Sequence, residues 1–351
     1  MAETAVLTKE SYVPTDADFK LKNNVSDNFV DSNFASQSFF KEVVARFKKK
    51  KSAVLGLVFV LIITFFAFVG PIMNEYTYSG QDLSKKNLAP RIPVIEYTGL
   101  FDGHENISTT SGVKTVNLYF DNKLTDTFFW FGSDNFGRDI WTRTWSGAQV
   151  SLIIAVAAAI IDMIIGMSYG LISGYFGGKV DMVMQRILEI ANGIPRLVIV
   201  TLLLLVFKPG MITIIVALML TEWVGMSRIA RAEMLKLKEQ EFVLASRTLG
   251  AGSMHIIFSE VLPNIIGPII TQIMFSIPTA IFTEAFLSFV GLGIPVPRCS
   301  LGSLISEGFN SFTTHPYQII PPIVVMALLM LSFNLVADGL REALDPKLKE
   351  M

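Results

Sequence analysis

Long apolar stretches separated by polar segments run along this chain, and their spacing predicts a helical membrane protein. A bilayer hydrocarbon core needs roughly 20 apolar residues for each helical crossing. Four stretches satisfy this requirement and two are interrupted, so we predict six crossings, near residues 53–73, 150–172, 183–207, 211–228, 265–290 and 318–338. In the third, Arg186 and Glu189 lie in the first half. That half must therefore lie against protein or at the membrane interface.

The polar segments divide the chain into five predicted parts. They are a cytoplasmic N-terminal tail, a first transmembrane helix, an extracytoplasmic insertion, a five-helix core and a cytoplasmic C-terminal tail, at residues 1–50, 51–74, 75–147, 148–340 and 341–351. We expect the first tail to end in a short interfacial helix from Ser38 to Lys50. In the insertion, prolines with β-branched and aromatic residues favour short strands and turns. The core contains a polar loop at residues 239–263.

Composition agrees with a membrane protein that also has sizeable polar parts. The 351 residues are 51% hydrophobic and 17% charged, with a mean hydropathy of +0.51. This is too apolar for a soluble domain and too charged for a chain that is embedded throughout. Basic residues stand before the first predicted crossing and after the fourth, at Arg46, Lys48, Lys49, Lys50, Lys51, Arg228, Arg231, Lys236 and Lys238. Because such residues mark the cytoplasmic side, we predict that both termini are cytoplasmic.

The basic run before the first crossing is interpreted as this topology signal rather than as a lipid-specific site. The first 40 residues are polar and the first apolar stretch is long enough to remain as an anchor, so we expect no cleavable signal.

A single cysteine, Cys299, excludes an internal disulfide. It lies on the predicted outer side, where we expect a reagent that cannot cross membranes to reach it.

A polar island at residues 241–264 lies between the fourth and fifth predicted crossings. Phe242, Ala245 and Leu249 recur at helical spacing and predict one narrow apolar stripe. Gly250 and Gly252 then allow the helix to end in a left-handed cap. The island is therefore predicted to be a short amphipathic helix followed by a turn.

This island resembles the "EAA" loop of ABC-importer permeases, whose short helix docks into a groove on the cytoplasmic ATPase. The resemblance rests on Ala245-Ser246-x-x-x-Gly250, followed by Leu262-Pro263. Leu244 stands in place of the family's leading acid, and Ser246 in place of its second alanine. The resemblance implies ATPase-coupling roles for Phe242, Ala245, Ser246, Leu249, Gly250, Leu262 and Pro263. An ordinary amphipathic surface loop is the alternative.

A second motif, FGSDNFGRD at residues 131–139, ends the predicted insertion. With the residues that follow, it is similar to the G-T-D-x-x-G-R-D-x-x-S-R segment of permeases from the oligopeptide, dipeptide and nickel importer family. Gly137 suits a tight turn in this segment. We expect Asp134, Arg138 and Asp139 to form an ion-pair cluster on the outer rim of the protein.

The second predicted crossing carries Gly166, Gly170 and Gly174, four residues apart, which predicts close approach of another helix backbone. The following turn is similar to the same family's S-G-Y-x-G-G-x-x-D segment. There we expect Asp181 to cap the next helix and Arg186 to pair with Glu189. The helix of the fourth crossing is expected to continue through Arg231 toward the polar island.

Two carboxylates fall within predicted crossings, Asp162 in the second and Glu284 in the fifth. A charge in the bilayer costs about 2.5 to 3.5 kcal/mol on insertion scales, so each is expected to face protein or water. Both are candidates for the translocation path, and a buried structural hydrogen-bonding role is the alternative for each. Glu284 begins a segment that resembles the family's E-x-x-L-S-F-L-G-L-G, with LSFVGLG at residues 287–293.

Several kinds of chemistry lack their residues in this chain. No Gly-x-x-x-x-Gly-Lys-Ser/Thr loop occurs, so we expect no nucleotide site here. His104, His255 and His315 are far apart without paired ligand spacing, which argues against a metal site. We therefore expect no bound cofactor and no enzymatic activity. Nucleic-acid binding is not expected either, because the basic residues are tied to membrane ends.

The resemblance implies an all-α membrane protein with six transmembrane helices of the type I ABC importer permease fold and a small extracytoplasmic insertion between helices 1 and 2. It implies a permease subunit in a bacterial plasma membrane that translocates peptides. The implied partners are a second homologous permease, two cytoplasmic ATPases that hold ATP and Mg, an extracytoplasmic binding protein and membrane lipid. Nickel or another small solute is an alternative cargo. An ion-coupled secondary transporter that uses Asp162 and Glu284, or a membrane receptor, is an alternative from another class.

Overall fold

The computed structural model describes residues 39–344, except residues 100, 110–111 and 125. Within this part the chain is helical, with a single two-stranded sheet. Residues 1–42 and 43–351 form separate units. The predicted tails at residues 1–38 and 345–351 lie outside the described residues. A helix was expected from Ser38 to Lys50 and is present as α1, Phe39–Lys49; its position at the membrane interface stays a prediction.

The remaining helices follow in order along the chain, with the longest connection between α2 and α3. They are α2 Lys51–Val69, α3 Leu118–Asp121, α4 Ile140–Ile161, α5 Ser168–Phe176, α6 Gly178–Gly193, α7 Arg196–Val206, α8 Met211–Thr221, α9 Trp223–Leu237, α10 Glu241–Thr248, α11 Ser253–His255, α12 Leu262–Leu287, α13 Leu301–Asn310 and α14 Ile320–Leu344. Three π-helical segments, Asp162–Met167, Ile256–Val261 and Ser288–Leu292, continue neighbouring helices.

Five helical spans in the described part are long and apolar enough to cross a membrane. They are Lys51–Ile72, Ile140–Phe176, Met211–Leu237, Ser253–Leu292 and Pro316–Leu344, and they contain five of the six predicted crossings. The predicted third crossing, residues 183–207, is divided between α6 and α7. Ile194 adopts an extended conformation before Pro195, as residues that precede proline prefer. These residues therefore do not form one continuous helix.

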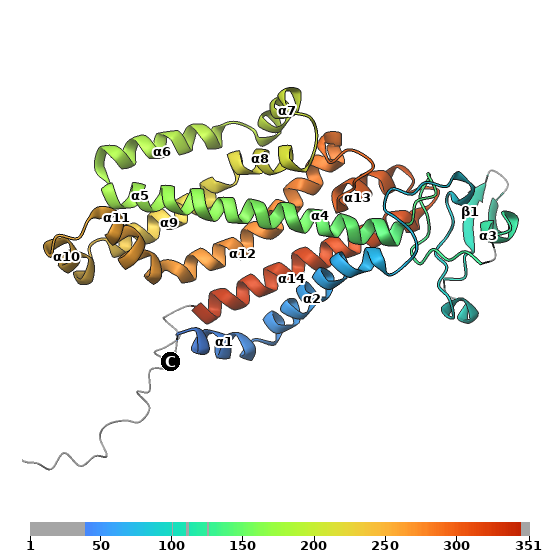
Figure 1. Cartoon of the computed structure of the whole chain (residues 1–351), viewed down its shortest axis with the longest axis horizontal. Coiled ribbons are helices and arrows are strands. Elements are labelled where there is room, and N and C mark those ends of the chain that lie inside the picture. The colour runs from blue at the N-terminus through green and yellow to red at the C-terminus, as the bar shows by residue number, and fades with distance from the viewer. Residues whose placement is uncertain (1–38, 100, 110–111, 125, 345–351) are drawn as a thin grey trace, which may run out of the picture. The chain divides into compact units, whose positions relative to one another are not determined.

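The membrane-capable helices pack around a shared apolar core. In Figure 1, α14 lies along α2, and α12 packs against both α14 and α4. Leu152 and Ile154 of α4, Ile281 of α12 and Leu329 of α14 are buried in this core. The apolar residues that predicted the crossings therefore also hold the helices together.

The glycines of the second crossing bring two helix backbones together, as predicted. A Cβ atom added at Gly170 would lie 2.1 Å from the carbonyl oxygen of Ser227. One added at Gly174 would lie 2.8 Å from the Cβ of Met234. Both neighbours belong to α9, which packs along α5. The close contact fixes α9 and hence the start of the polar island that follows it.

The segment between α2 and α4 contains the predicted strands and turns. Strands β1, Glu105–Thr109, and β2, Gly112–Val116, pair antiparallel, with Glu105 opposite Val116 and Thr109 opposite Gly112. The same segment also contains a small core of Leu88, Tyr119 and Phe129. The hydroxyl of Tyr119 donates a hydrogen bond of 2.8 Å to the carbonyl oxygen of Ala89. The segment thus has an apolar core of its own.

Candidate functional site

The polar island at residues 241–264 is anchored to the neighbouring helices by a buried apolar side chain. Helix α10 inserts Val243, which is fully buried, into a core that contains Met234 of α9 and Ile256 and Ile257 of the following π-helical segment. The end of α5 contributes Leu171 to the same core. Helix α10 is therefore packed against the ends of two membrane-capable spans and the start of a third.

The predicted apolar stripe of α10 faces away from this core. Leu249 is 88% exposed and Phe242 is 39% exposed. Leu244 and Met254 are also exposed. Ala245 is exposed and Ser246 is half-buried. Large apolar side chains gathered on an otherwise polar loop are typical of a surface that another protein covers.

The end of α10 is a Schellman cap at Gly250, as predicted. Gly250 has φ of +86°, its backbone N–H donates to the carbonyl oxygen of Arg247, and that of Ala251 donates to Ser246. The suggested second left-handed position, Gly252, has φ of −69° and is extended instead. One left-handed residue is sufficient to reverse the chain, so Gly252 is free to begin the next helical turn.

The island continues without a break into α12. Leu262, which is half-buried, and the exposed Pro263 form its first turn, where proline needs no backbone N–H. On the other side, α9 runs past Arg231 to Leu237, as predicted. Short turns therefore join α10 to α9 on one side and to the helical segment that leads into α12 on the other.

Two further contacts join the island and α9 to the end of α5. The guanidinium of Arg247 lies over the ring of Tyr175, 5.4 Å from its centroid. The ammonium of Lys238 donates a 3.2 Å hydrogen bond to the carbonyl oxygen of Gly174. The turn after the second crossing and the polar island therefore form one unit.

The prediction that Asp181 caps α6 is wrong. Its carboxylate instead accepts hydrogen bonds from Nε and a terminal nitrogen of Arg231 in α9, at 2.7 and 2.6 Å, and one from Ser173. The hydrogen bonds from Arg231 lower the pKa of Asp181 to about 2. The predicted pair of Arg186 with Glu189 is confirmed, at 2.5 Å, and it lies on the surface.

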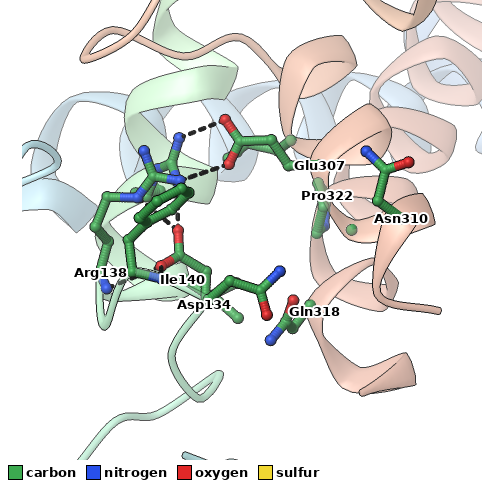
Figure 2. Close-up of a pocket in the computed structure, with 12 residues that line it drawn as sticks. Asp134, Arg138, Ile140, Glu307, Asn310, Gln318 and Pro322 are labelled. Atoms are coloured by element: carbon green, nitrogen blue, oxygen red, sulfur yellow. Dashed lines mark hydrogen bonds and ion pairs between the residues drawn. The ribbon is translucent and has the colours of Figure 1, made fainter. Parts of the chain in front are cut away.

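An ion-pair network surrounds the start of α4 (Figure 2). One oxygen of Asp134 accepts from Nε of Arg138 at 2.6 Å and from Arg143 at 2.5 Å. Glu307 of α13 accepts from both arginines, at 2.7 and 2.8 Å. The two arginines are almost completely buried. The predicted pair of Asp134 with Arg138 is confirmed. The participation of Glu307 was not predicted, because Glu307 belongs to no motif in the sequence.

Asp139 does not join this network, contrary to the prediction. It is the N-cap of α4, where its carboxylate accepts from the backbone N–H of Thr142 at 2.8 Å and from the side-chain amide of Asn74 at 2.7 Å. Burial raises the pKa of Asp139. Gly137 has φ of +69° in the turn between the motif's acids, as its predicted role requires. The network borders a cavity of about 150 Å³.

The two carboxylates of the predicted crossings are both buried. Glu284 is fully buried and accepts hydrogen bonds from Ser151 at 3.1 Å and Ser288 at 2.7 Å. Asp162 lies in a π-helical segment, and one of its oxygens accepts from Ser276 at 2.5 Å. Its other oxygen has no hydrogen-bond partner within the described residues. The hydrogen bonds of Glu284 therefore fit a buried structural role. Asp162 differs, because only one of its two carboxylate oxygens accepts a hydrogen bond from a described residue.

Cys299 is not on an accessible surface, contrary to the expectation from the sequence. Its side chain is 2% exposed, and the thiol donates a 3.4 Å hydrogen bond to the carbonyl oxygen of Arg143. Burial also raises the pKa of the thiol, which lowers the fraction of reactive thiolate.

Fold and site together define a polytopic helical membrane protein with a loop helix that exposes apolar side chains. Residues 166–350 match the model of the binding-protein-dependent transport system inner membrane component. Residues 38–90 match that of the N-terminal TM domain of oligopeptide transport permease C. The chain therefore belongs to the family of inner-membrane permease components of binding-protein-dependent ABC importers.

Three relatives are similar over nearly their whole length. The chain is 39% identical to the oligopeptide transport system permease protein OppC of Bacillus subtilis (strain 168), over 90% of this chain and 92% of the relative. It is 42% identical to the dipeptide transport system permease protein DppC of Lactococcus lactis subsp. cremoris (strain MG1363), over 89% and 92%. It is 32% identical to OppC of Escherichia coli (strain K12), over 93% and 98%.

A chain of the MetNI methionine ABC transporter in an inward-facing conformation is similar more distantly. It shares 18% identity and a TM-score of 0.49, over 58% of this chain and 96% of that chain. The family assignment rests on the sequence relatives.

Proposed function

We propose that this chain is the permease through which an ATP-driven ABC importer moves peptides across the membrane. The observation that carries the proposal is the outward-facing apolar surface of α10, held in place by the buried Val243. The peptide cargo is supported by the relatives, which are named as oligopeptide and dipeptide permeases. The proposed partners are a second homologous permease, two cytoplasmic ATPases that bind ATP and Mg, and an extracytoplasmic binding protein.

In the assembled importer we propose six crossings, with α6 and α7 together as the third. Both helices expose apolar side chains, among them Ile190 at 68% and Leu202 at 57%. Lipid or the second permease would cover these side chains. The predicted division into two cytoplasmic tails, an extracytoplasmic insertion and a membrane core is kept in this proposal, with both chain ends cytoplasmic because basic residues flank them.

The proposed mechanism is alternating access driven through α10. Each ATPase would hold the coupling surface formed by Phe242, Ala245, Ser246, Leu249 and Gly250, with Leu262 and Pro263 at its hinge into α12. Closure of the ATPases would displace α10, and α9 and α12 would carry that displacement into the membrane as rigid elements. Differential contact of the coupling surface with the two ATPase states would shift the equilibrium between inward-open and outward-open forms.

The other candidate residues have different proposed roles. The ion pairs of Asp134 and Arg138 hold the start of α4 to α13 through Glu307, and Asp139 caps the same helix. These residues and Gly137 would keep the outer rim rigid while the cytoplasmic side moves. Of the two membrane carboxylates, Asp162 is proposed to border the translocation path, and Glu284 to hold α12 against α4 through its hydrogen bond with Ser151.

The test of the coupling surface is Leu249→Asp in the chain coexpressed with its partners. Because Leu249 makes almost no contact with its own chain, the variant should insert normally. Charge at the centre of an interface should lower both copurification of the ATPases and peptide uptake about tenfold or more. Leu83→Asp is the matched control, since Leu83 is also exposed, at 67%, but lies between α2 and α4. Normal ATPase recovery with Leu249→Asp would refute the docking assignment, and nickel uptake without peptide uptake would refute the cargo.

A further inference from the structure

A polar cavity opens beside the membrane-capable helices and is distinct from the ion-pair network at the start of α4. Its volume is about 270 Å³. The lining comes from the end of α6, the junction of α8 with α9 and the middle of α12, through Asn192, Thr221, Glu222, Val224, Gly225, Arg228, Gln272, Phe275, Ser276 and Thr279. Polar groups at this depth are costly in lipid, so the cavity must face protein, water or cargo.

The lining of this cavity carries hydrogen-bond donors that no described residue uses. Arg228, which is exposed, makes no ion pair or hydrogen bond with any described residue, although it lies in the apolar span Met211–Leu237. The side-chain amides of Gln272 and Asn192 likewise make no hydrogen bond within the described part. By contrast, Arg231, one turn further along α9, is bound to Asp181.

Carboxylates also lie in this lining or next to it. Glu222 lines the cavity directly. Ser276, which also lines it, donates its hydroxyl hydrogen bond to Asp162, whose second oxygen is left without a partner. The cavity therefore combines an unpaired guanidinium with acidic groups, an arrangement that suits a ligand with charges of both signs.

Peptides have such charges at their two ends whatever their side chains. Their terminal carboxylate accepts two parallel N–H bonds from a guanidinium, which is the geometry that makes arginine the preferred carboxylate partner. Their backbone carbonyl and N–H groups match the acceptors and donors of primary amides such as those of Gln272 and Asn192. A site made of these groups reads the peptide backbone and tolerates many side chains.

We propose that Arg228, assisted by Gln272 and Asn192, binds the C-terminal carboxylate of a peptide during its passage. This proposal rests on the proposed function as a peptide permease. This chain forms only part of the wall of the cavity, and the second permease would form the rest. A carboxylate of that second permease is the competing occupant, and the experiment below separates the two.

The experiment compares uptake of alanine peptides of two to five residues, as free acids and as C-terminal amides, by the complete importer in cells. The variants of this chain are Arg228→Gln and Arg228→Lys. Arg228→Gln should lower the uptake rate of free-acid peptides about tenfold, the size expected for loss of a charge-assisted hydrogen bond, and leave that of the amides unchanged. Arg228→Lys retains the charge and should restore part of the difference. Arg186→Gln is the matched control, because Arg186 is exposed and, among the described residues, pairs only with Glu189 three positions later.

The outcomes distinguish between a peptide carboxylate and a carboxylate of the second permease as the partner of Arg228. An equal loss for free acids and amides would overturn the proposal and assign Arg228 to the second permease, whereas unchanged uptake of both would remove it from the path. Because the binding protein is the same in every strain, its own preference for a free carboxylate cancels in the comparison. If the unaltered importer takes up none of the free-acid peptides, the proposed function itself fails, and this failure is distinct from a failure at Arg228.

Discussion

At the scale of single residues, the ion pair of Asp181 with Arg231 shows how this protein joins its loops to its membrane helices. The carboxylate receives two hydrogen bonds from the guanidinium, and the two side chains are 16% and 30% exposed. Hydrogen bonds to charged groups each contribute about 1.5 to 3 kcal/mol when they are shielded from water. The pair therefore ties the start of α6 to α9 more firmly than an exposed surface pair would.

Asp181→Asn should lower the free energy of unfolding by about 1 to 3 kcal/mol, because it removes the charge and one of the two acceptors for Arg231. The measurement is thermal unfolding of the purified protein in detergent, at matched protein concentration. Glu189→Gln is the control, since the pair of Arg186 with Glu189 is exposed, and it should change the stability by less than about 0.5 kcal/mol. Equal effects of the two substitutions would contradict the buried bridge.

The pH dependence of the same pair has a definite sign. The pKa of Asp181 is lowered to about 2 in the folded protein, and an unfolded aspartate has a pKa of about 3.9. A lowered pKa stabilises the fold above the unfolded value and loses that contribution as pH falls through the folded one. The stability difference between the parent protein and Asp181→Asn should thus be constant from about pH 5 to 8 and shrink below about pH 4. A difference that varies around neutral pH would contradict this assignment.

Residue roles were predictable where a motif brings the partners together along the chain. The pair of Asp134 with Arg138 and the turn at Gly137 are of this kind. Glu307 was missed because it lies 164 positions after Arg143, and only the packing of α13 on α4 brings them together. For Asp181 the local rule for helix caps gave the wrong partner, because the half-buried guanidinium of Arg231 in α9 offers stronger bonds than backbone N–H groups do.

At the scale of elements, the contact of α5 with α9 determines where α10 is presented. Gly170 has no room for a side chain, since an added Cβ would meet the carbonyl oxygen of Ser227 at 2.1 Å. Gly170→Ala should therefore push the two helices apart and lower the free energy of unfolding by about 1 to 3 kcal/mol, as overpacking does. Because α10 follows α9 directly, displacement of α9 should also move α10 and reduce peptide uptake.

Gly193→Ala is the control for this substitution. Gly193 lies in the last turn of α6, and an added Cβ there would meet no atom within 4 Å. It should leave the stability unchanged or slightly raised, because alanine loses less backbone entropy than glycine in a helix. Thermal unfolding of both variants decides the matter. If Gly170→Ala is as stable as the parent, the helices do not pack as closely as these distances indicate.

Hydrophobic periodicity predicted the elements well wherever a crossing is a single helix. Five of the predicted crossings coincide with membrane-capable spans, although the span that contains the second begins at Ile140, because Asp139 caps it there. The predicted third crossing is not a continuous helix, because the helix is interrupted before Pro195. The hydrophobic pattern does not reveal this interruption, since apolar residues lie on both sides of Pro195. Helix α10 was placed correctly, but only the structure shows that Val243 faces inward while the predicted stripe faces outward.

At the scale of the whole molecule, the remaining question of function is which side of the membrane each polar segment faces. Coupling to cytoplasmic ATPases requires α10 inside, and delivery of cargo by an extracytoplasmic protein requires the segment between α2 and α4 outside. These two positions are separated by an odd number of crossings in the proposed six-helix arrangement. The basic residues before α2 and along α9 agree with that orientation.

Two introduced cysteines can test the orientation in whole cells, because the native Cys299 is buried and its thiol pKa is raised, so the parent chain should stay unlabelled. Tyr97→Cys, at a position 86% exposed between α2 and α4, should react with a thiol reagent that cannot cross the membrane. Glu239→Cys, at an exposed position between α9 and α10 that lies outside the coupling surface, should react only when the membrane is made permeable. The opposite pattern would invert the protein and remove α10 from the reach of any cytoplasmic ATPase. Labelling of both from outside would place the two segments on one side and exclude the six-crossing arrangement.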